Sequence, residues 1–61
     1  MPFAIQIDPR HRVGLIVFRG TVDGVLALDA AQALIDDAAW QSGFDEVWDL
    51  TAATSLAVSP A

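Results

Sequence analysis

Residues 12–20 read Arg12-Val13-Gly14-Leu15-Ile16-Val17-Phe18-Arg19-Gly20, and this stretch decides the fold class. In an extended chain, side chains alternate between the two faces. Here the odd-numbered positions 13, 15 and 17 are apolar, and so are Ile16 and Phe18 on the opposite face. A strand that is apolar on both faces is typical of an inner strand covered on two sides. We expect Gly20 to end it.

The residues before this stretch predict a second strand that pairs with it. Phe3–Asp8 alternates, with Phe3, Ile5 and Ile7 on one face. Asp8-Pro9-Arg10-His11 then has turn chemistry, because the aspartate side chain can accept from nearby backbone amides and proline presets its own backbone angle. The two strands and this short turn predict an antiparallel hairpin.

The residues after Gly20 predict one long helix over about residues 24–39. Thr21 or Asp23 can cap it by accepting from the free amides of its first turn. The segment is rich in alanine and leucine, which favour helix. Its polar stripe is narrow and consists of Asp29, Gln32 and Asp36. A helix with so little polar surface is expected to pack on the sheet with one side and on something else with another.

A third strand is predicted over residues 44–50, after Gln41-Ser42-Gly43 closes the helix. Because a helix joins it to the preceding strand, it should run parallel to that strand through a right-handed crossover. The expected fold class is therefore α/β, a small mixed three-stranded sheet with one main helix. Residues 51–61 have a weaker pattern, in which Ser59-Pro60 resembles the start of a second helix.

The size and composition of the chain favour self-association. The 61 residues allow one domain at most, and a domain this small buries only about 60% of its unfolded surface. There is no cysteine, which excludes disulfides, and the single histidine argues against a His-rich zinc site. Apolar residues make up 54% of the chain, and the mean hydropathy is +0.46. We expect a homo-oligomer, with a dimer favoured, and no cofactor.

The charge pattern excludes other classes of partner. Eight acidic residues face three arginines and no lysine, for a net charge of −5. Such a chain repels phosphate backbones, so nucleic-acid binding is not expected. No apolar run approaches the ~20 residues needed to span a bilayer. The N-terminus lacks the basic and apolar regions of a signal peptide, so we expect a cytoplasmic protein.

Several segments, in this order along the chain, carry a resemblance to a known family. They are Ile7-Asp8-Pro9 with Arg12-Val13, Phe18-Arg19-Gly20-Thr21-Val22, Asp37-Ala38-Ala39-Trp40 with Gly43-Phe44, Trp48-Asp49-Leu50-Thr51-Ala52-Ala53-Thr54, and Ser59-Pro60. The order resembles the N-terminal half of STAS-type domains, in particular the SpoIIAA-like group named after anti-sigma-factor antagonists. The resemblance implies that residues 1–61 are a single, partial STAS-like domain with a mixed sheet flanked by helices and no catalytic activity.

The resemblance also implies a candidate phosphoserine at Ser59. In the antagonists, a serine at the start of the helix after this strand is phosphorylated, which controls docking to an anti-sigma kinase. The family motif there reads Asp-Ser-Ser-Gly, whereas this chain has Ala57-Val58-Ser59-Pro60. Because the acidic neighbour and the glycine are missing, a plain N-cap serine is the favoured interpretation of Ser59.

The polar residues do not assemble into a catalytic pattern. Asp36-Asp37 with Asp45, Glu46 and Asp49 suggests a magnesium site or a receiver-like phosphoacceptor site. A receiver needs a lysine and an acidic pair after its first strand, and this chain has no lysine and only Asp8-Pro9 at that place. Solvated surface acids are therefore the favoured interpretation. Asp49, with Thr51, remains a candidate ligand site because ligands gather at the carboxyl ends of strands in open α/β sheets. His11 is expected to be an exposed turn residue without a nucleophile beside it.

Four large apolar residues are candidates for an interface: Leu26, Leu34, Trp40 and Trp48. Tryptophans are frequent interface hot spots, but they also anchor cores. A core position is favoured for Trp48, and both interpretations stay open for Trp40.

The sequence favours a non-catalytic protein–protein interaction or regulatory module that self-associates through its apolar helix face and open sheet edge. A second hypothesis is a carrier of small apolar ligands or lipids, with a cavity formed between subunits. A third is a piece of a longer domain with no independent role. An enzyme is not expected, because no nucleophile–base pair or metal cluster can be assembled from these residues.

Overall fold

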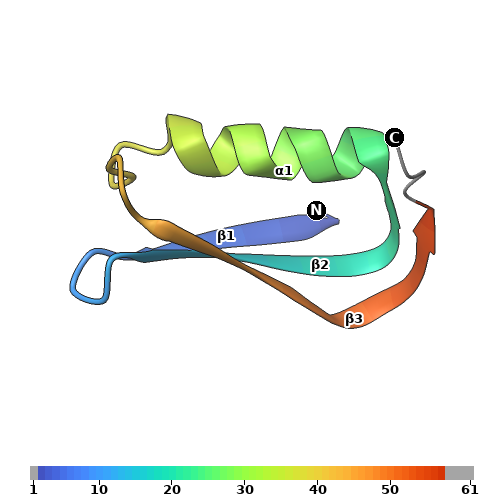
Figure 1. Ribbon diagram of the computed structural model, residues 1–61. Coiled ribbons are helices and arrows are strands. Elements are labelled where there is room, and N and C mark those ends of the chain that lie inside the picture. The colour runs from blue at the N-terminus through green and yellow to red at the C-terminus, as the bar shows by residue number, and fades with distance from the viewer. Residues whose placement is uncertain (1, 58–61) are drawn as a thin grey trace.

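The computed structural model describes residues 2–57 as one sheet and one helix. The elements are β1 (Phe3–Asp8), β2 (Val13–Asp23), α1 (Gly24–Asp36) and β3 (Asp45–Ala57). The strand order is β1-β2-β3, with β1 antiparallel and β3 parallel to β2. Figure 1 shows α1 along one face of the sheet. The predicted α/β fold, a hairpin followed by a helix and a parallel third strand, is confirmed.

The hairpin turn forms as its residues predict. Asp8 Oδ1 accepts from the backbone amides of Arg10 and His11, at 3.0 and 3.2 Å. Asp8 and Val13 face each other as the last pair of the ladder. Arg12 completes the turn with a positive φ of 57°, a conformation that costs a non-glycine residue about 1 kcal/mol. The side chain of Asp8 therefore takes over backbone bonding where the ladder stops.

β2 does not end at Gly20, as the sequence suggested, but continues to Asp23. Gly20 has a φ of +72° and lies beside a shift in register between β2 and β3, at which β3 has the extra residue, so the strand passes through Gly20 with both Gly20 and Thr21 paired. Pairing resumes beyond it, with Thr21 opposite Ser55 and the hydroxyl of Ser55 donating to that of Thr21 at 3.1 Å. Pairing with β3, which is distant in sequence, therefore extends β2 beyond Gly20.

The helix begins where expected and ends early. Asp23 is the N-cap, and its carboxylate accepts from the amide of Leu26 at 2.8 Å. The last helical residue is Asp36, three residues before the predicted end. Asp37 is extended and its side chain accepts from the amide of Ala39 at 2.9 Å. This local turn competes with another helical turn, which is a common effect of aspartate.

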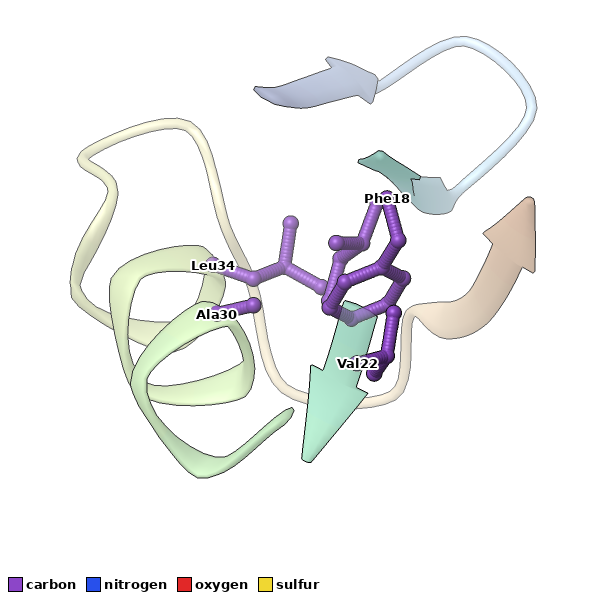
Figure 2. Packing of buried hydrophobic residues seen from close by; sticks show 5 residues of the cluster. Phe18, Val22, Ala30 and Leu34 are labelled. Atoms are coloured by element: carbon purple, nitrogen blue, oxygen red, sulfur yellow. The ribbon is translucent and has the colours of Figure 1, made fainter. Parts of the chain in front are cut away.

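The core lies between α1 and the strands β1 and β2 (Figure 2). Its fully buried members come from β2 and the inner stripe of the helix: Ile16, Phe18, Val22, Ala30 and Leu34. The apolar face of β1 packs against this cluster at its edge. Because Ala27 and Ala30 are small, they let the helix lie close to the sheet, and Leu34 fills the remaining space.

Gly14 marks the closest approach between the sheet and the chain above it. A Cβ at this position would lie 2.8 Å from the ring of Trp40 and 2.9 Å from Leu34. Both distances are below van der Waals contact, so only glycine fits here without movement of its neighbours. The absent side chain in β2 is therefore a packing requirement, and it fixes the position of Trp40 just beyond the helix.

β3 is much longer than the predicted 44–50 strand and runs to Ala57. Two register shifts between β2 and β3 give β3 extra residues relative to its partner. Extra residues bend a strand, and Figure 1 shows β3 bent sharply near its middle. The segment after Leu50, which has a weak pattern in the sequence, is thus held as strand by pairing with the end of β2.

The second face of the sheet carries no element of the described residues (Figure 1). Val13, Leu15 and Val17 lie on this face, opposite the side of Ile16 and Phe18, and they are half-buried. The expectation that the inner strand is covered on two sides is met on one side only within residues 2–57. Neighbouring strands shield these residues in part, and the rest of their surface is open.

Candidate interaction surface

The outer side of α1 exposes three large apolar side chains, which we call the helix surface: Val25, Leu28 and Ile35. Leu28 is 73% exposed and Val25 is 69% exposed. Leu28 and Ile35 are seven residues apart, which places them two turns apart on one stripe of the helix. They lie next to the polar stripe, so the apolar surface of the helix extends well beyond the part that packs on the sheet.

β3 carries four more exposed apolar side chains, which we call the β3 surface: Val47, Trp48, Leu50 and Leu56. Val47 lies on the opposite face of the sheet from Trp48, which is on the side of the helix. Leu56 is 61% exposed although it pairs with the buried Val22. In the described part of the chain β3 is an edge strand, because the sheet order leaves it with β2 as its one neighbour. α1 packs over β1 and β2, which explains why apolar side chains of β3 on the helix side stay open to solvent.

Trp48 belongs to this surface, and the prediction of a core position for it was wrong. The indole is 44% exposed. One side packs on Phe18, with ring centroids 5.3 Å apart and a tilt of 57°. Its Nε1 donates to the carboxylate of Glu46 at 3.2 Å. The ring therefore closes the core at the level of β3 and presents its other side to solvent.

Among the other interface candidates, Leu34 is corrected to a core residue. It is fully buried between α1 and β2, where no partner can reach it. Leu26 and Trp40 are half-buried and pack against the core cluster. Trp40 also meets Phe44 edge-on, with ring centroids 5.6 Å apart. The structure thus separates the four candidates and leaves Trp48 as the one with a large open surface.

Asp49 and Thr51 do not lie at the carboxyl end of an inner strand, so that prediction is corrected. Asp49 lies in the middle of an edge strand that continues to Ala57. Its Oδ1 accepts from the hydroxyl of Thr51 at 2.7 Å and from the backbone amide of Thr51 at 2.9 Å. These bonds hold the pKa of Asp49 below its usual range, the side-chain bond most strongly. The Asp49 carboxylate therefore accepts from Thr51 at the point where β3 shifts its register against β2.

His11 lies on the exposed hairpin turn, where the sequence placed it. Its Nδ1 is 2.6 Å from Oδ2 of Asp8. The side-chain hydrogen bond from His11 lowers the pKa of Asp8. In residues 2–57, no third side chain makes a hydrogen bond to this pair, and the other bonds to Asp8 come from backbone amides of the turn. The pair therefore stabilises the turn.

Acidic residues are unevenly distributed along β3. Asp45, Glu46 and Asp49 lie in its first half, and residues 50–57 carry no charge. Within the described residues, no group of histidine and acidic side chains is arranged to hold a metal ion, and no pocket is present. No helix in this part of the chain is long and apolar enough to cross a membrane. Ser59 lies outside the described residues.

Most of the exposed apolar residues are not among the interface candidates that the sequence predicts. Leu28 and Ile35 sit next to Asp29 and Asp36, and this adjacency to the polar stripe is the signal that places them outside. Leu56 had no comparable signal, because its segment was predicted as a weak tail. Its position depends on pairing with β2, which lies far away in the sequence.

No protein-family model matches the chain, and no curated protein or solved structure matches it.

Proposed function

We propose that the chain is a non-catalytic protein–protein interaction or regulatory module that self-associates, most simply as a dimer. The carrying observation is the set of large apolar side chains on the helix surface and the β3 surface, seven in a chain of 61 residues. Large exposed apolar patches on small proteins mark interaction sites, and seven such side chains in so small a chain leave much apolar surface open. In this proposal the module belongs to the STAS-like, SpoIIAA-like family and works in the cytoplasm.

The total surface supports the proposal. The chain has an accessible surface of 4290 Å². A compact folded monomer of 6.5 kDa exposes about 3,800 Å² by the scaling of surface with mass. The difference between these two areas is more than half of the roughly 800 Å² that each partner buries in a standard interface.

The test is the solution mass, measured by light scattering over a dilution series, with circular dichroism on the same samples. We expect a dimer at high concentration that dissociates on dilution, with loss of structure if association is obligate. Leu28→Lys and Leu56→Lys place a charge on each surface separately, and Gln32→Lys is the helix control, with the same change in net charge and no apolar side chain removed. A folded monomer at every concentration contradicts self-association.

Native mass spectrometry on the same samples distinguishes this module from a carrier. A protein that binds through its own surfaces gives a dimer mass equal to twice that of the chain. An apolar molecule that is bound to the dimer in a fixed ratio, and is released when the dimer dissociates, would contradict the proposed function and support a ligand cavity between subunits.

A further inference from the structure

We propose that the self-association rests on antiparallel pairing of β3 with β3 of a second copy, about a twofold axis at Ala53. This inference depends on the proposed function and specifies its geometry. Within residues 2–57, β3 presents an open edge, because β2 is its one neighbour in the sheet. An open edge of unpaired backbone groups is a template for a strand of another chain.

The charges of β3 select the orientation. Parallel pairing in register would place Asp45, Glu46 and Asp49 directly opposite the same acids of the second copy. Like charges directly opposite are destabilising, and β3 carries no cation to compensate them. Antiparallel pairing removes every one of these contacts, because it places the charged half of each strand away from that of its partner.

The charges also select the half of the strand that pairs. Charged side chains on an edge strand oppose pairing, and they protect the first half of β3. Residues 50–57 carry no charged side chain. One register shift, between Asp49 and Ala52, lies where the acids end, and a second lies within the uncharged half, between Ala53 and Ser55. The pairing therefore spans about eight residues and has a bulge near its centre.

The exposed leucines then select the register. With the axis at Ala53, Leu50 lies opposite Leu56 of the second copy, and Leu56 lies opposite Leu50. Both belong to the β3 surface, and Leu56 is 61% exposed in the single chain. The register apposes two pairs of apolar side chains, and it places Asp49 opposite the neutral Ala57. Cross-strand apolar pairs are the unit of stabilisation in such an arrangement.

Cysteine cross-linking tests orientation and register together, and the absence of native cysteine makes it clean. Leu50→Cys and ¹⁵N-labelled Leu56→Cys are purified reduced, mixed and oxidised in air. Opposite residues of antiparallel strands have Cα atoms about 4.5–5.5 Å apart, within the range of a disulfide. We expect a disulfide between the labelled and unlabelled chains, and none in either variant alone.

The other outcomes of cross-linking separate this inference from the proposed function. Cross-linking of each variant with itself would indicate parallel strands and overturn the inference. Leu28→Cys is the control on the helix surface, and its cross-linking in place of the β3 pair would also overturn it. In both cases the dimer, and thus the proposed function, would stand. A monomer by light scattering removes both.

A charge pair gives a second test that does not depend on oxidation. In this register residue 57 faces Asp49 of the second copy, so Ala57→Lys should tighten the dimer severalfold and Ala57→Glu should weaken it severalfold. Ala38→Lys and Ala38→Glu are the controls, since Ala38 is exposed outside β3 and makes the same change in net charge. If the two pairs of variants shift the dissociation constant equally, the register is wrong.

Discussion

Phe18 is fully buried while Trp48, whose ring centroid lies 5.3 Å from that of Phe18, is 44% exposed. The tryptophan forms the outer layer of the core on β3, because α1 packs over the other two strands. Phe18 is therefore covered by a side chain that is itself about half exposed to solvent. Trp48 contributes both to the core and to the exposed apolar surface.

Replacement of Trp48 tests this arrangement. Trp48→Ala removes the cover of Phe18 and should lower the free energy of unfolding by about 2 kcal/mol, less than the 3–5 kcal/mol typical of fully buried aromatics. Val47→Ala is the control, because Val47 is similarly exposed on the same strand and should cost below about 1 kcal/mol. Urea denaturation measures both, and equal costs would mean that Trp48 does not close the core.

Gly14 is expected to tolerate no side chain. Gly14→Ala places a Cβ 2.8 Å from Trp40 and 2.9 Å from Leu34, and overpacking of this kind should cost about 1–3 kcal/mol. Gly24→Ala is the matched control, since no atom lies within 4 Å of its added Cβ. It should be neutral or stabilising by up to about 1 kcal/mol. A thermal melt that ranks the two variants the other way would contradict the close approach.

The N-cap of α1 should contribute measurably to stability. Asp23→Ala removes the acceptor of the Leu26 amide and should cost about 1 kcal/mol. Asp23→Asn keeps an acceptor and should recover most of this loss. Asp29→Ala changes the net charge equally in an exposed part of the helix and should stay within about 0.5 kcal/mol. Helical circular dichroism in urea measures all three, and an equal loss for Asp29→Ala would point to charge instead of capping.

Acid should weaken the fold through Asp49. Its pKa is lowered from 3.8 by the hydrogen bonds from Thr51, so the folded state favours the carboxylate. The corresponding stability is present above about pH 4 and is lost as the pH falls through the folded pKa. Thr51→Val removes the hydroxyl donor, and the pKa of Asp49, measured by NMR titration, should rise. A pKa that is the same in both proteins would show that the hydroxyl plays no part.

The elements of the fold follow from local patterns, whereas their ends do not. Alternation in β1 and β2, and the turn chemistry of Asp8, are properties of adjacent residues, so the hairpin could be predicted. Gly20 is a stop signal by itself, yet the strand passes through it because Thr21 finds a partner 34 residues away. The same pairing makes residues 51–57 a strand.

Open apolar surface could be predicted from the sequence, but most of the residues that form it could not. The excess of apolar residues indicated open apolar surface on the helix and at the sheet edge. Which leucine of a nearly all-apolar helix faces the sheet depends on a small rotation, and Ala30 and Leu34 face inward while Leu28 faces out. Large apolar residues were the natural candidates from the sequence, whereas the close approach of the helix to the sheet requires small residues, such as Ala30, on its inner side.

Asp23 has a mechanical consequence, because it is both the last residue of β2 and the N-cap of α1. No hinge separates the central strand from the helix, whereas residues 37–44 lie between α1 and β3. A tilt of the helix would therefore act directly on the end of β2, the strand that pairs with both edge strands.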